Sequence, residues 1–330
     1  MIDRRLFLGG ATAALTLPSF GVGKAMAEQA KALKVASVKF GSLAWLLDTI
    51  RAEGLDKKFG LAMEVVEIAS NQGSAVALYG GSADVVVSDW TWGLRQRSKG
   101  EALKFSPFSS ALGSIMVPEA SAIKSYADLG GKRLGVAGSA IDKSWLLLRA
   151  YSVKIHGKDI ADFAVPQFGA APLLAEQARD GKLDAVLNFW TYSARLKGTG
   201  FRSILTMSEV MSALGIDPQP ALVGFIWKEA TSAAQPGAIK ALLGAAAEAN
   251  AILAKSDAAW DRLRPIMNVT SDGEFAALRD GYRQGIPGAW READMRSAEK
   301  ILNLLVETGD TDLVGDGTRF DTKLFDTSGA

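Results

Sequence analysis

Two stretches of this chain repeat each other at a separation of one hundred residues. Residues 33–97 align without a gap on residues 133–197 with twelve identities, which include two tryptophans, charged residues and a glycine. The pairs include Trp45 with Trp145, Gly81 with Gly181, Asp84 with Asp184, Trp90 with Trp190 and Arg95 with Arg195. A duplicated segment of this size predicts two similar structural units, because each copy carries the same pattern of residues. Chance alignment of two α/β segments is the alternative.

Each copy shows the same order of predicted elements, with strands separated by helix-like stretches. The predicted strands of the first copy are residues 33–38, 63–68 and 84–87. Those of the second copy are residues 133–136, 163–168 and 184–187. Strands that alternate with helices are typical of a parallel sheet with both faces covered. The predicted fold class is therefore α/β with two lobes, each a mostly parallel sheet flanked by helices.

Turn residues indicate where the chain crosses between the predicted lobes. Pro118 ends a strand-like segment, and the proline- and glycine-containing residues 215–220 precede another apolar run. We assign residues 30–117 and 222–330 to lobe 1 and residues 118–221 to lobe 2. Apolar residues at helical spacing over 239–253 and 295–305 predict two helices that pack on lobe 1.

The N-terminal residues have the pattern of an export signal. The Arg4-Arg5 pair precedes an apolar run over residues 6–17, which is too short to span a bilayer as a stable helix. This order resembles a twin-arginine signal, and Ala-Met-Ala at residues 25–27 is typical of a signal peptidase site. We expect residues 1–27 to be a signal peptide that is cleaved near Ala27 and the remaining chain to be soluble in the periplasm. An uncleaved anchor is the alternative.

Composition excludes several functional classes. The chain has 37 basic and 36 acidic residues, so no surplus of positive charge favours nucleic acid. It has no cysteine and a single histidine, His156. Thiol nucleophiles, Cys or His zinc sites and Ser-His pairs therefore cannot be assembled. We expect no catalytic residues, no metal site and no cofactor.

Two segments resemble a known family. Residues 125–136 (SYADLGGKRLGV) resemble the segment that opens the second lobe in periplasmic substrate-binding proteins of ABC importers, and residues 80–86 (GGSADVV) resemble a segment of their first lobe. With the export signal, the length and the C-terminal helices, the resemblance extends to the nitrate, sulfonate and taurine branch. It implies a monomeric receptor whose lobes close on a small molecule. The implied partners are an ABC permease and its ATPase.

The carboxyl ends of the predicted strands locate the ligand cleft, because ligands bind beyond those ends in open parallel sheets. The candidate ligand-binding residues follow the strands of each copy. In the first copy they are Lys39, Ser42, Trp45, Asn71, Gly73, Ser74, Ser88, Asp89 and Trp90. In the second copy they are Gly138, Ser139, Asp142, Asn188, Trp190 and Tyr192. Backbone N–H groups at the helix starts favour an anion, although a serine there is also a common N-cap.

Aromatic residues supply the expected walls of the cleft. We predict that Trp90 and Trp190 face each other across it, whereas for Trp45 and Trp145 both the cleft and the core remain open. Asp89 either binds a ligand donor or caps the helix that begins at Trp90. An anion site, a carboxylate and flat walls together favour a zwitterionic or heterocyclic ligand.

Three functions are compatible with these patterns. The first is a periplasmic receptor without enzymatic activity. The second is an enzyme similar to a pyrimidine-precursor synthase of the same fold, whose cysteine-rich iron-binding motif this chain lacks. The third is a ligand sensor that docks on a membrane signalling protein. A neighbouring permease and ATPase gene pair would favour import, and a neighbouring receptor kinase would favour sensing.

Overall fold

Two five-stranded mixed sheets organise the computed structural model, which describes residues 31–38, 41–68, 73–309 and 318–326. The first sheet has the order β2-β1-β3-β10-β4. Its strands are β1 (Lys31–Val38), β2 (Leu61–Ile68), β3 (Val85–Asp89), β4 (Leu103–Ser109) and β10 (Val223–Lys228). The second sheet has the order β7-β6-β8-β5-β9. Its strands are β5 (Ser114–Pro118), β6 (Arg133–Ala137), β7 (Val165–Gly169), β8 (Ala185–Asn188) and β9 (Phe201–Thr206).

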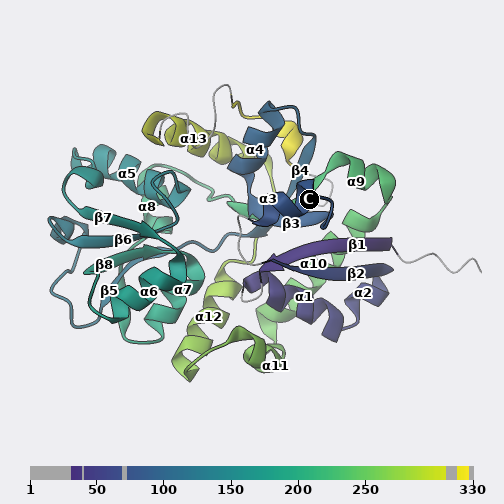
Figure 1. Ribbon diagram of the computed structural model, residues 1–330, viewed down its shortest axis with the longest axis horizontal. Coiled ribbons are helices and arrows are strands. Elements are labelled where there is room, and N and C mark those ends of the chain that lie inside the picture. Colours follow the sequence, from purple (N-terminus) through teal and green to yellow (C-terminus); the bar gives the residue numbers. More distant parts are fainter. Residues whose placement is uncertain (1–30, 39–40, 69–72, 310–317, 327–330) are drawn as a thin grey trace, which may run out of the picture.

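Helices cover both sheets, and the two halves lie side by side in Figure 1. We call the elements around the first sheet the first lobe and those around the second sheet the second lobe. The helices up to the end of the first copy are α1 (Ser42–Ala52), α2 (Leu55–Lys58), α3 (Gly73–Tyr79) and α4 (Trp90–Ser98). Those around the second sheet are η1 (Tyr126–Leu129), α5 (Lys143–His156), η2 (Ile160–Asp162), α6 (Ala171–Arg179), α7 (Trp190–Lys197) and α8 (Met207–Ala213). The C-terminal helices are α9 (Glu229–Ala234), α10 (Ala238–Lys255), α11 (Asp257–Met267), α12 (Asp272–Gln284), α13 (Glu292–Gly309) and η3 (Thr322–Leu324).

The two sheets confirm the predicted fold class and the repeat. In each sheet three strands are parallel, and one antiparallel strand, β10 or β5, pairs with two neighbours. The antiparallel strand lies at the same position in both sheet orders. Each of these strands begins just after the chain has crossed from the other sheet. The duplicated units therefore share one topology that includes a strand beyond the aligned residues.

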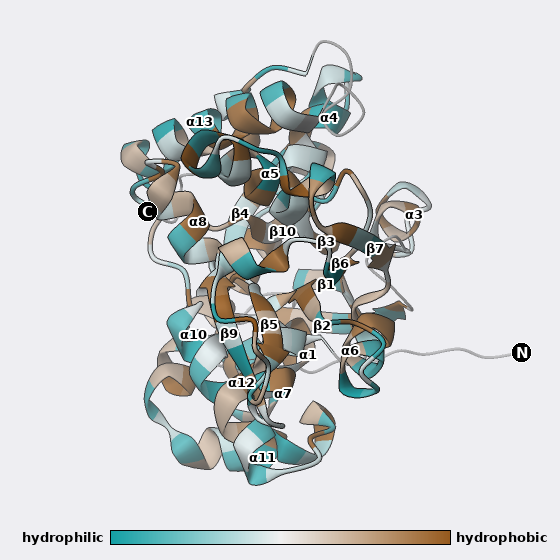
Figure 2. Ribbon diagram, turned by 90° about the vertical axis from the view of Figure 1, so that its left-hand side faces the viewer, coloured by the Kyte–Doolittle hydropathy of each residue, from teal (hydrophilic) through white to brown (hydrophobic). Residues whose placement is uncertain are grey.

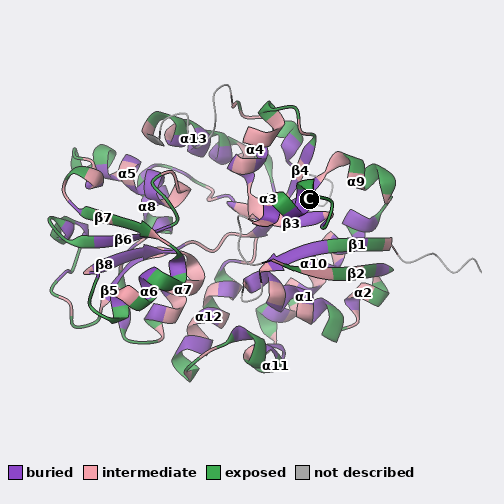
Figure 3. Ribbon diagram, in the orientation of Figure 1, coloured by how far each residue is buried: buried purple, intermediate pink, exposed green. Residues whose placement is uncertain are grey.

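Burial follows the position of each strand in its sheet. All four residues of the central strand β8 are buried, whereas the edge strands β2 and β7 are largely exposed or half-buried (Figure 3). Central strands of helix-covered sheets contact apolar layers on both faces, so they carry continuous apolar runs. Hydrophobic residues accordingly concentrate on strands such as β5, and hydrophilic residues on helices such as α12 (Figure 2).

The crossings between the sheets differ slightly from the predicted boundaries. Residues 110–113 connect β4 to β5, and β5 pairs with β8 and β9 of the second sheet. Residues 114–117, which we predicted in lobe 1, therefore lie in the second sheet, because Pro118 is the last residue of a strand that pairs there. The return crossing ends before β10, which begins at Val223.

The C-terminal helices do not all pack on the first lobe. Helix α10 packs against α1 and α2 as predicted, but α13 packs against α5 of the second lobe. Ile301, Leu302 and Leu305 of α13 share a buried cluster with Trp145 and its neighbours on α5. The prediction for residues 295–305 is therefore wrong. Helical periodicity gives the apolar face of a helix and not the surface that covers it.

Helix α12 joins the two lobes through a buried ion pair. Arg195 of α7 and Glu274 of α12 form this pair, with side chains 13% and 3% exposed. Glu274 also accepts a hydrogen bond from the Thr270 backbone N–H at 2.8 Å. Burial would raise the pKa of Glu274, but Thr270 and Arg195 hold it below its ordinary value. The pair leaves no unpaired buried charge at this contact.

Gly198 allows this close contact. A Cβ atom on Gly198 would lie 2.5 Å from the backbone N and Cα of Glu274. Backbone atoms cannot move aside as the end of a flexible side chain does. The residue at this position must therefore be glycine for α7 and α12 to approach as they do.

Replacing Gly198 with alanine should destabilise the protein by about 2 kcal/mol, because overpacking against backbone forces the helices apart. Gly130→Ala is the matched control, since nothing lies within 4 Å of a Cβ there and its φ is −56°. The free energy of unfolding, measured by urea titration, checks both variants. Equal stabilities of the two variants would contradict this account of the contact.

No helix in the described residues combines the length and the apolarity needed to cross a membrane.

Candidate functional site

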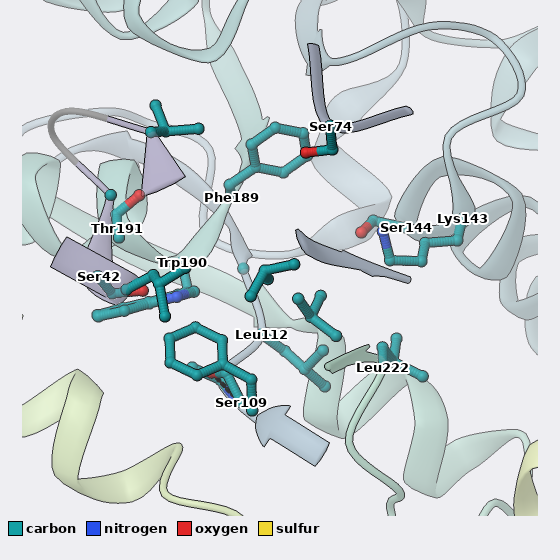
Figure 4. A pocket seen from close by; sticks show the side chains of 18 of the residues that line it. Ser42, Ser74, Ser109, Leu112, Lys143, Ser144, Phe189, Trp190, Thr191 and Leu222 are labelled. Atoms are coloured by element: carbon teal, nitrogen blue, oxygen red, sulfur yellow. Dashed lines mark hydrogen bonds between the residues drawn. The ribbon is translucent and has the colours of Figure 1, made fainter. Parts of the chain in front are cut away.

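A cavity of about 230 Å³ lies between the two lobes (Figure 4). Its lining comes from both sheets and from the crossing segments that connect them. The hydroxyl-bearing lining residues are Ser42, Ser74, Ser109, Ser144 and Thr191. The larger apolar ones are Leu43, Ile68, Phe108, Leu112, Phe189, Trp190 and Leu222. The cavity thus offers hydrogen-bonding groups on a mainly apolar wall, which is the usual composition of a small-molecule site.

Three helices begin at this cavity because each follows a parallel strand. Helices α1, α5 and α7 begin at Ser42, Lys143 and Trp190, and all three residues line the cavity. No side chain caps α1 or α7 in the described structure, whereas Asp142 caps α5. The first backbone N–H groups of a helix have no partners within the helix. The starts of α1 and α7 therefore present donors where the helix dipoles favour an anion.

Lys143 supplies the positive charge of the cavity. It is the one charged residue that the described part of the chain contributes to the lining. Figure 4 shows its side chain extending into the pocket on the side opposite Trp190 and Ser42. Burial would lower the pKa of Lys143, but the carboxylates of Asp89 and Asp142 raise it above its ordinary value. The ammonium group is therefore charged at neutral pH.

The two carboxylates beside Lys143 are both N-caps. Asp89 caps α4 by accepting a 2.9 Å hydrogen bond from the Trp92 backbone N–H, and Asp142 caps α5 by accepting one from Ser144. Burial would raise the pKa of Asp89, but Lys143, Thr91 and Trp92 hold it below its ordinary value. Burial raises the pKa of Asp142 and outweighs the opposing effect of Lys143. Neither aspartate lines the cavity itself.

The structure brings together only part of the predicted site. Ser42, Ser74 and Trp190 line the cavity. Lys39 and Asn71 lie outside the described residues. The predicted residues that are absent from the lining are Trp45, Gly73, Ser88, Asp89, Trp90, Gly138, Ser139, Asp142, Asn188 and Tyr192.

Trp90 does not face Trp190, so the prediction of two opposed walls is wrong. The Trp90 side chain is fully buried, and its ring lies 6.2 Å from that of Phe325, near the C-terminus. Trp190 instead lies against Trp45 of the first lobe, with the two rings 6.2 Å apart and nearly perpendicular. The repeat places the two residues at equivalent backbone positions. Different segments cover them, because Trp90 packs against Phe325 near the C-terminus and Trp190 against Tyr282 of α12.

Other predicted residues have structural roles. Trp45 is fully buried in the aromatic cluster with Trp260, so it belongs to the core. Asn188 is also buried, and its amide donates to the Ala171 carbonyl oxygen at 3.0 Å and accepts from the Phe189 backbone N–H at 2.9 Å. Ser88 follows the lining residue Val87, and successive strand residues point to opposite faces.

The remaining predicted residues lie outside the lining because of local packing. Tyr192 packs against a small apolar cluster of the second lobe, and burial raises its pKa. Gly138 and Ser139 are exposed in the turn after β6, where Gly138 has a φ of +98°. Gly73, at the first position of α3, precedes Ser74, which does line the cavity.

Sequence reasoning missed Lys143, the main charged group. Its signal was present, because Lys143 directly follows Asp142, which we predicted as a ligand-binding residue. It also missed the crossing segment around Ser109–Gly113 and the return segment at Leu222. Segments that cross between two lobes lie at the floor of the cleft, so the predicted crossings themselves could have indicated these residues.

Trp90→Ala should lower the free energy of unfolding by about 3–5 kcal/mol, the range for a large aromatic side chain lost from a core. Trp190→Ala should cost clearly less, because Trp190 is partly exposed at the cavity. Urea unfolding of both variants without ligand provides the comparison. A larger loss for Trp190→Ala would mean that the two environments are assigned the wrong way round.

Comparisons with known proteins agree with this architecture. A family model described as NMT1/THI5 like matches residues 51–258. The periplasmic aliphatic sulphonate binding protein SsuA from Escherichia coli is similar in structure, with a TM-score of 0.70 and 17% identity over 89% of this chain and 91% of that chain. The alkanesulfonate-binding protein SsuA from Xanthomonas axonopodis pv. citri, bound to MOPS, has a TM-score of 0.66 and 17% identity over 87% of this chain and 95% of that chain.

An enzyme shares the same fold. The desulfurization enzyme DSZB has a TM-score of 0.59 and 17% identity over 89% of this chain and 99% of that chain. Among curated proteins, none matches this sequence. At these identities the structural similarities establish the fold of the chain.

Proposed function

The chain belongs to the NMT1/THI5-like family, and on that premise we propose that it is a periplasmic receptor that captures a small organic anion between its lobes for an ABC importer. The observation that carries the proposal is the charged Lys143 side chain in a cavity whose other described lining residues are hydroxyl-bearing or apolar. An ammonium group in such surroundings is a strong partner for an anion, because charge-assisted hydrogen bonds are stronger than neutral ones.

The cavity favours a ligand with an anionic group and a small apolar body. The uncapped starts of α1 and α7 add backbone donors, and Phe108, Phe189 and Trp190 provide apolar surface. The two SsuA proteins are named for binding sulfonates, and a sulfonate combines these two features. The zwitterionic ligand expected from Asp89 is less well supported, since Asp89 caps α4 and does not line the cavity.

An enzymatic role is the second candidate, favoured by the similarity to the desulfurization enzyme DSZB. The chain lacks a thiol nucleophile because it has no cysteine. Its one histidine, His156, stacks on Tyr126 at the far end of α5 from the cavity. Lys143 has a raised pKa, which makes it a poor general base at neutral pH. These features favour a binding role over an enzymatic one.

Delivery to a permease and its ATPase, the monomeric state and closure of the lobes are parts of the same proposal. Hinge closure on a ligand is a common switch in two-lobed proteins. The segments between the lobes offer a hinge. The β4–β5 connection meets the α12–α13 connection where the Ser110 backbone N–H donates to the Gly285 carbonyl oxygen at 2.8 Å. A sensor that docks on a signalling protein would bind the same ligand in the same cavity.

Binding of butanesulfonate, measured by titration calorimetry, tests the ligand class. We expect Lys143→Gln to weaken this binding at least tenfold, because a hydrogen bond to a charged group contributes about 1.5–3 kcal/mol. Lys154→Gln is the matched control, since Lys154 lies exposed on the same helix. Neutral butanesulfonamide should bind wild type much more weakly than butanesulfonate. Equal binding of the two compounds would refute an anion receptor.

Export provides a separate test, because the predicted signal lies outside the described residues. Protein recovered from the periplasm should have the mass of residues 28–330, and Lys-Lys in place of Arg4-Arg5 should retain the full-length chain in the cytoplasm. Intact-mass measurement of the two cell fractions gives the result. Wild-type protein found only in the cytoplasm at full length would contradict the periplasmic assignment.

A further inference from the structure

Asp89 and Lys143 form an ion pair that joins the two lobes. Asp89 is the last residue of β3 in the first sheet, and Lys143 is the first residue of α5 in the second lobe. Lys143 Nζ lies 3.8 Å from Asp89 Oδ2, and the side chains are 20% and 28% exposed. Of the two residues, Lys143 alone lines the cavity. Asp89 therefore acts on a bound molecule through the ammonium group and through its own charge.

The Asp89 carboxylate has a fixed orientation. Its Oδ1 accepts hydrogen bonds from the Thr91 hydroxyl and from the Trp92 backbone N–H. The other carboxylate oxygen, Oδ2, faces Lys143. Its distance of 3.8 Å from Lys143 Nζ is longer than a hydrogen bond. Lys143 Nζ therefore keeps its donors for a ligand, although Asp89 already compensates its charge.

The charges around this pair balance one another. Arg95 of α4 and Lys143 act on Asp89, and Asp89 and Asp142 act on Lys143. Two positive and two negative groups thus act on one another around the Asp89–Lys143 contact. The rest of the described lining is hydroxyl, backbone and apolar. Among the described lining residues, a second negative charge on a ligand would find no counter-charge besides Lys143, and burying an unpaired charge is costly.

Building on the proposed function, we propose that Asp89 is a specificity-determining residue that restricts the receptor to ligands with a single negative charge. A monoanion shares the Lys143 ammonium with Asp89. A dianion brings an additional charge that the Asp89 and Asp142 carboxylates repel at low local dielectric. Because Asp89 and Lys143 come from different lobes, this selection operates in the arrangement in which the lobes enclose the cavity.

Two probes of nearly equal shape test the inference. Butanesulfonate carries one negative charge at all ordinary pH values, whereas butylphosphonate carries one in mildly acidic and two in mildly alkaline solution. Opposing carboxylates hold the pKa of Lys143 above its ordinary value, and Lys143 holds that of Asp89 below. Both groups thus stay charged between about pH 6 and about pH 9. Burial raises the pKa of Asp142, so butanesulfonate, whose charge is constant, reports any titration of the protein itself. A change in affinity that only butylphosphonate shows therefore reports ionisation of the phosphonate.

Calorimetry of the wild-type protein should show butylphosphonate binding that weakens about tenfold or more from about pH 6 to about pH 9, whereas butanesulfonate binding changes less than about twofold. In Asp89→Asn, butylphosphonate binding should weaken only about threefold or less over the same pH interval, because Lys143 then lacks the Asp89 counter-charge and can compensate the second charge of the ligand. Asparagine is as good an N-cap as aspartate, so α4 should remain intact. Asp89→Ser, which also retains a capping group, is the second variant.

Asp159→Asn is the control, since Asp159 is also an N-cap that pairs with a cation, Arg149, and does not line the cavity. This variant should distinguish the singly and doubly charged forms of butylphosphonate as strongly as the wild type does. Equal affinity of the wild type for both charge states of butylphosphonate would overturn the inference and leave the receptor function standing. Unchanged discrimination in Asp89→Asn and Asp89→Ser would also overturn it. Failure of the wild type to bind butanesulfonate would overturn the proposed function and the inference with it.

Discussion

The polar character of the cavity depends on one constraint, the parallel alignment of strands within each sheet. Parallel strands end at one edge, so the helices that follow β1, β6 and β8 all begin near the cavity. Helix starts carry unpaired backbone N–H groups, which require an acceptor. Asp89 and Asp142 satisfy this requirement for α4 and α5, whereas the starts of α1 and α7 have no side-chain cap. The same geometry thus places the capping carboxylates and the backbone donors of α1 and α7 near one cavity.

The duplicated units are equivalent in topology but not in environment. Helix α4 is covered by the C-terminal segment through Phe325, whereas α7 is covered by α12. Trp90 therefore lies in the core, and Trp190 lies between the cavity and the aromatic cluster of Trp45. Of the two tryptophans, Trp190 therefore lines the cavity and Trp90 does not.

Two ion pairs connect the lobes and differ in their surroundings. The Arg195–Glu274 pair is almost fully buried and accompanied by close backbone contact at Gly198. The Asp89–Lys143 pair is partly exposed and lies at the cavity. A buried pair that loses one partner leaves an uncompensated charge, so the first contact resists separation more than the second. The lobes are therefore held more firmly along α7 and α12 than beside the ligand cavity.

The sequence by itself determined the repeat, the α/β class and the positions of the six strands of the two copies and of the long helices α10 and α13, because these depend on local periodicity. It also located Ser42, Ser74 and Trp190 at the cavity, since residues after parallel strands share one edge. Only the tertiary structure decided that Trp90 is buried, that α13 packs on α5 and that Lys143 faces Asp89 across the lobes. Each of these depends on contacts between segments far apart in the chain, and periodicity within a segment carries no information about which distant surface will cover it.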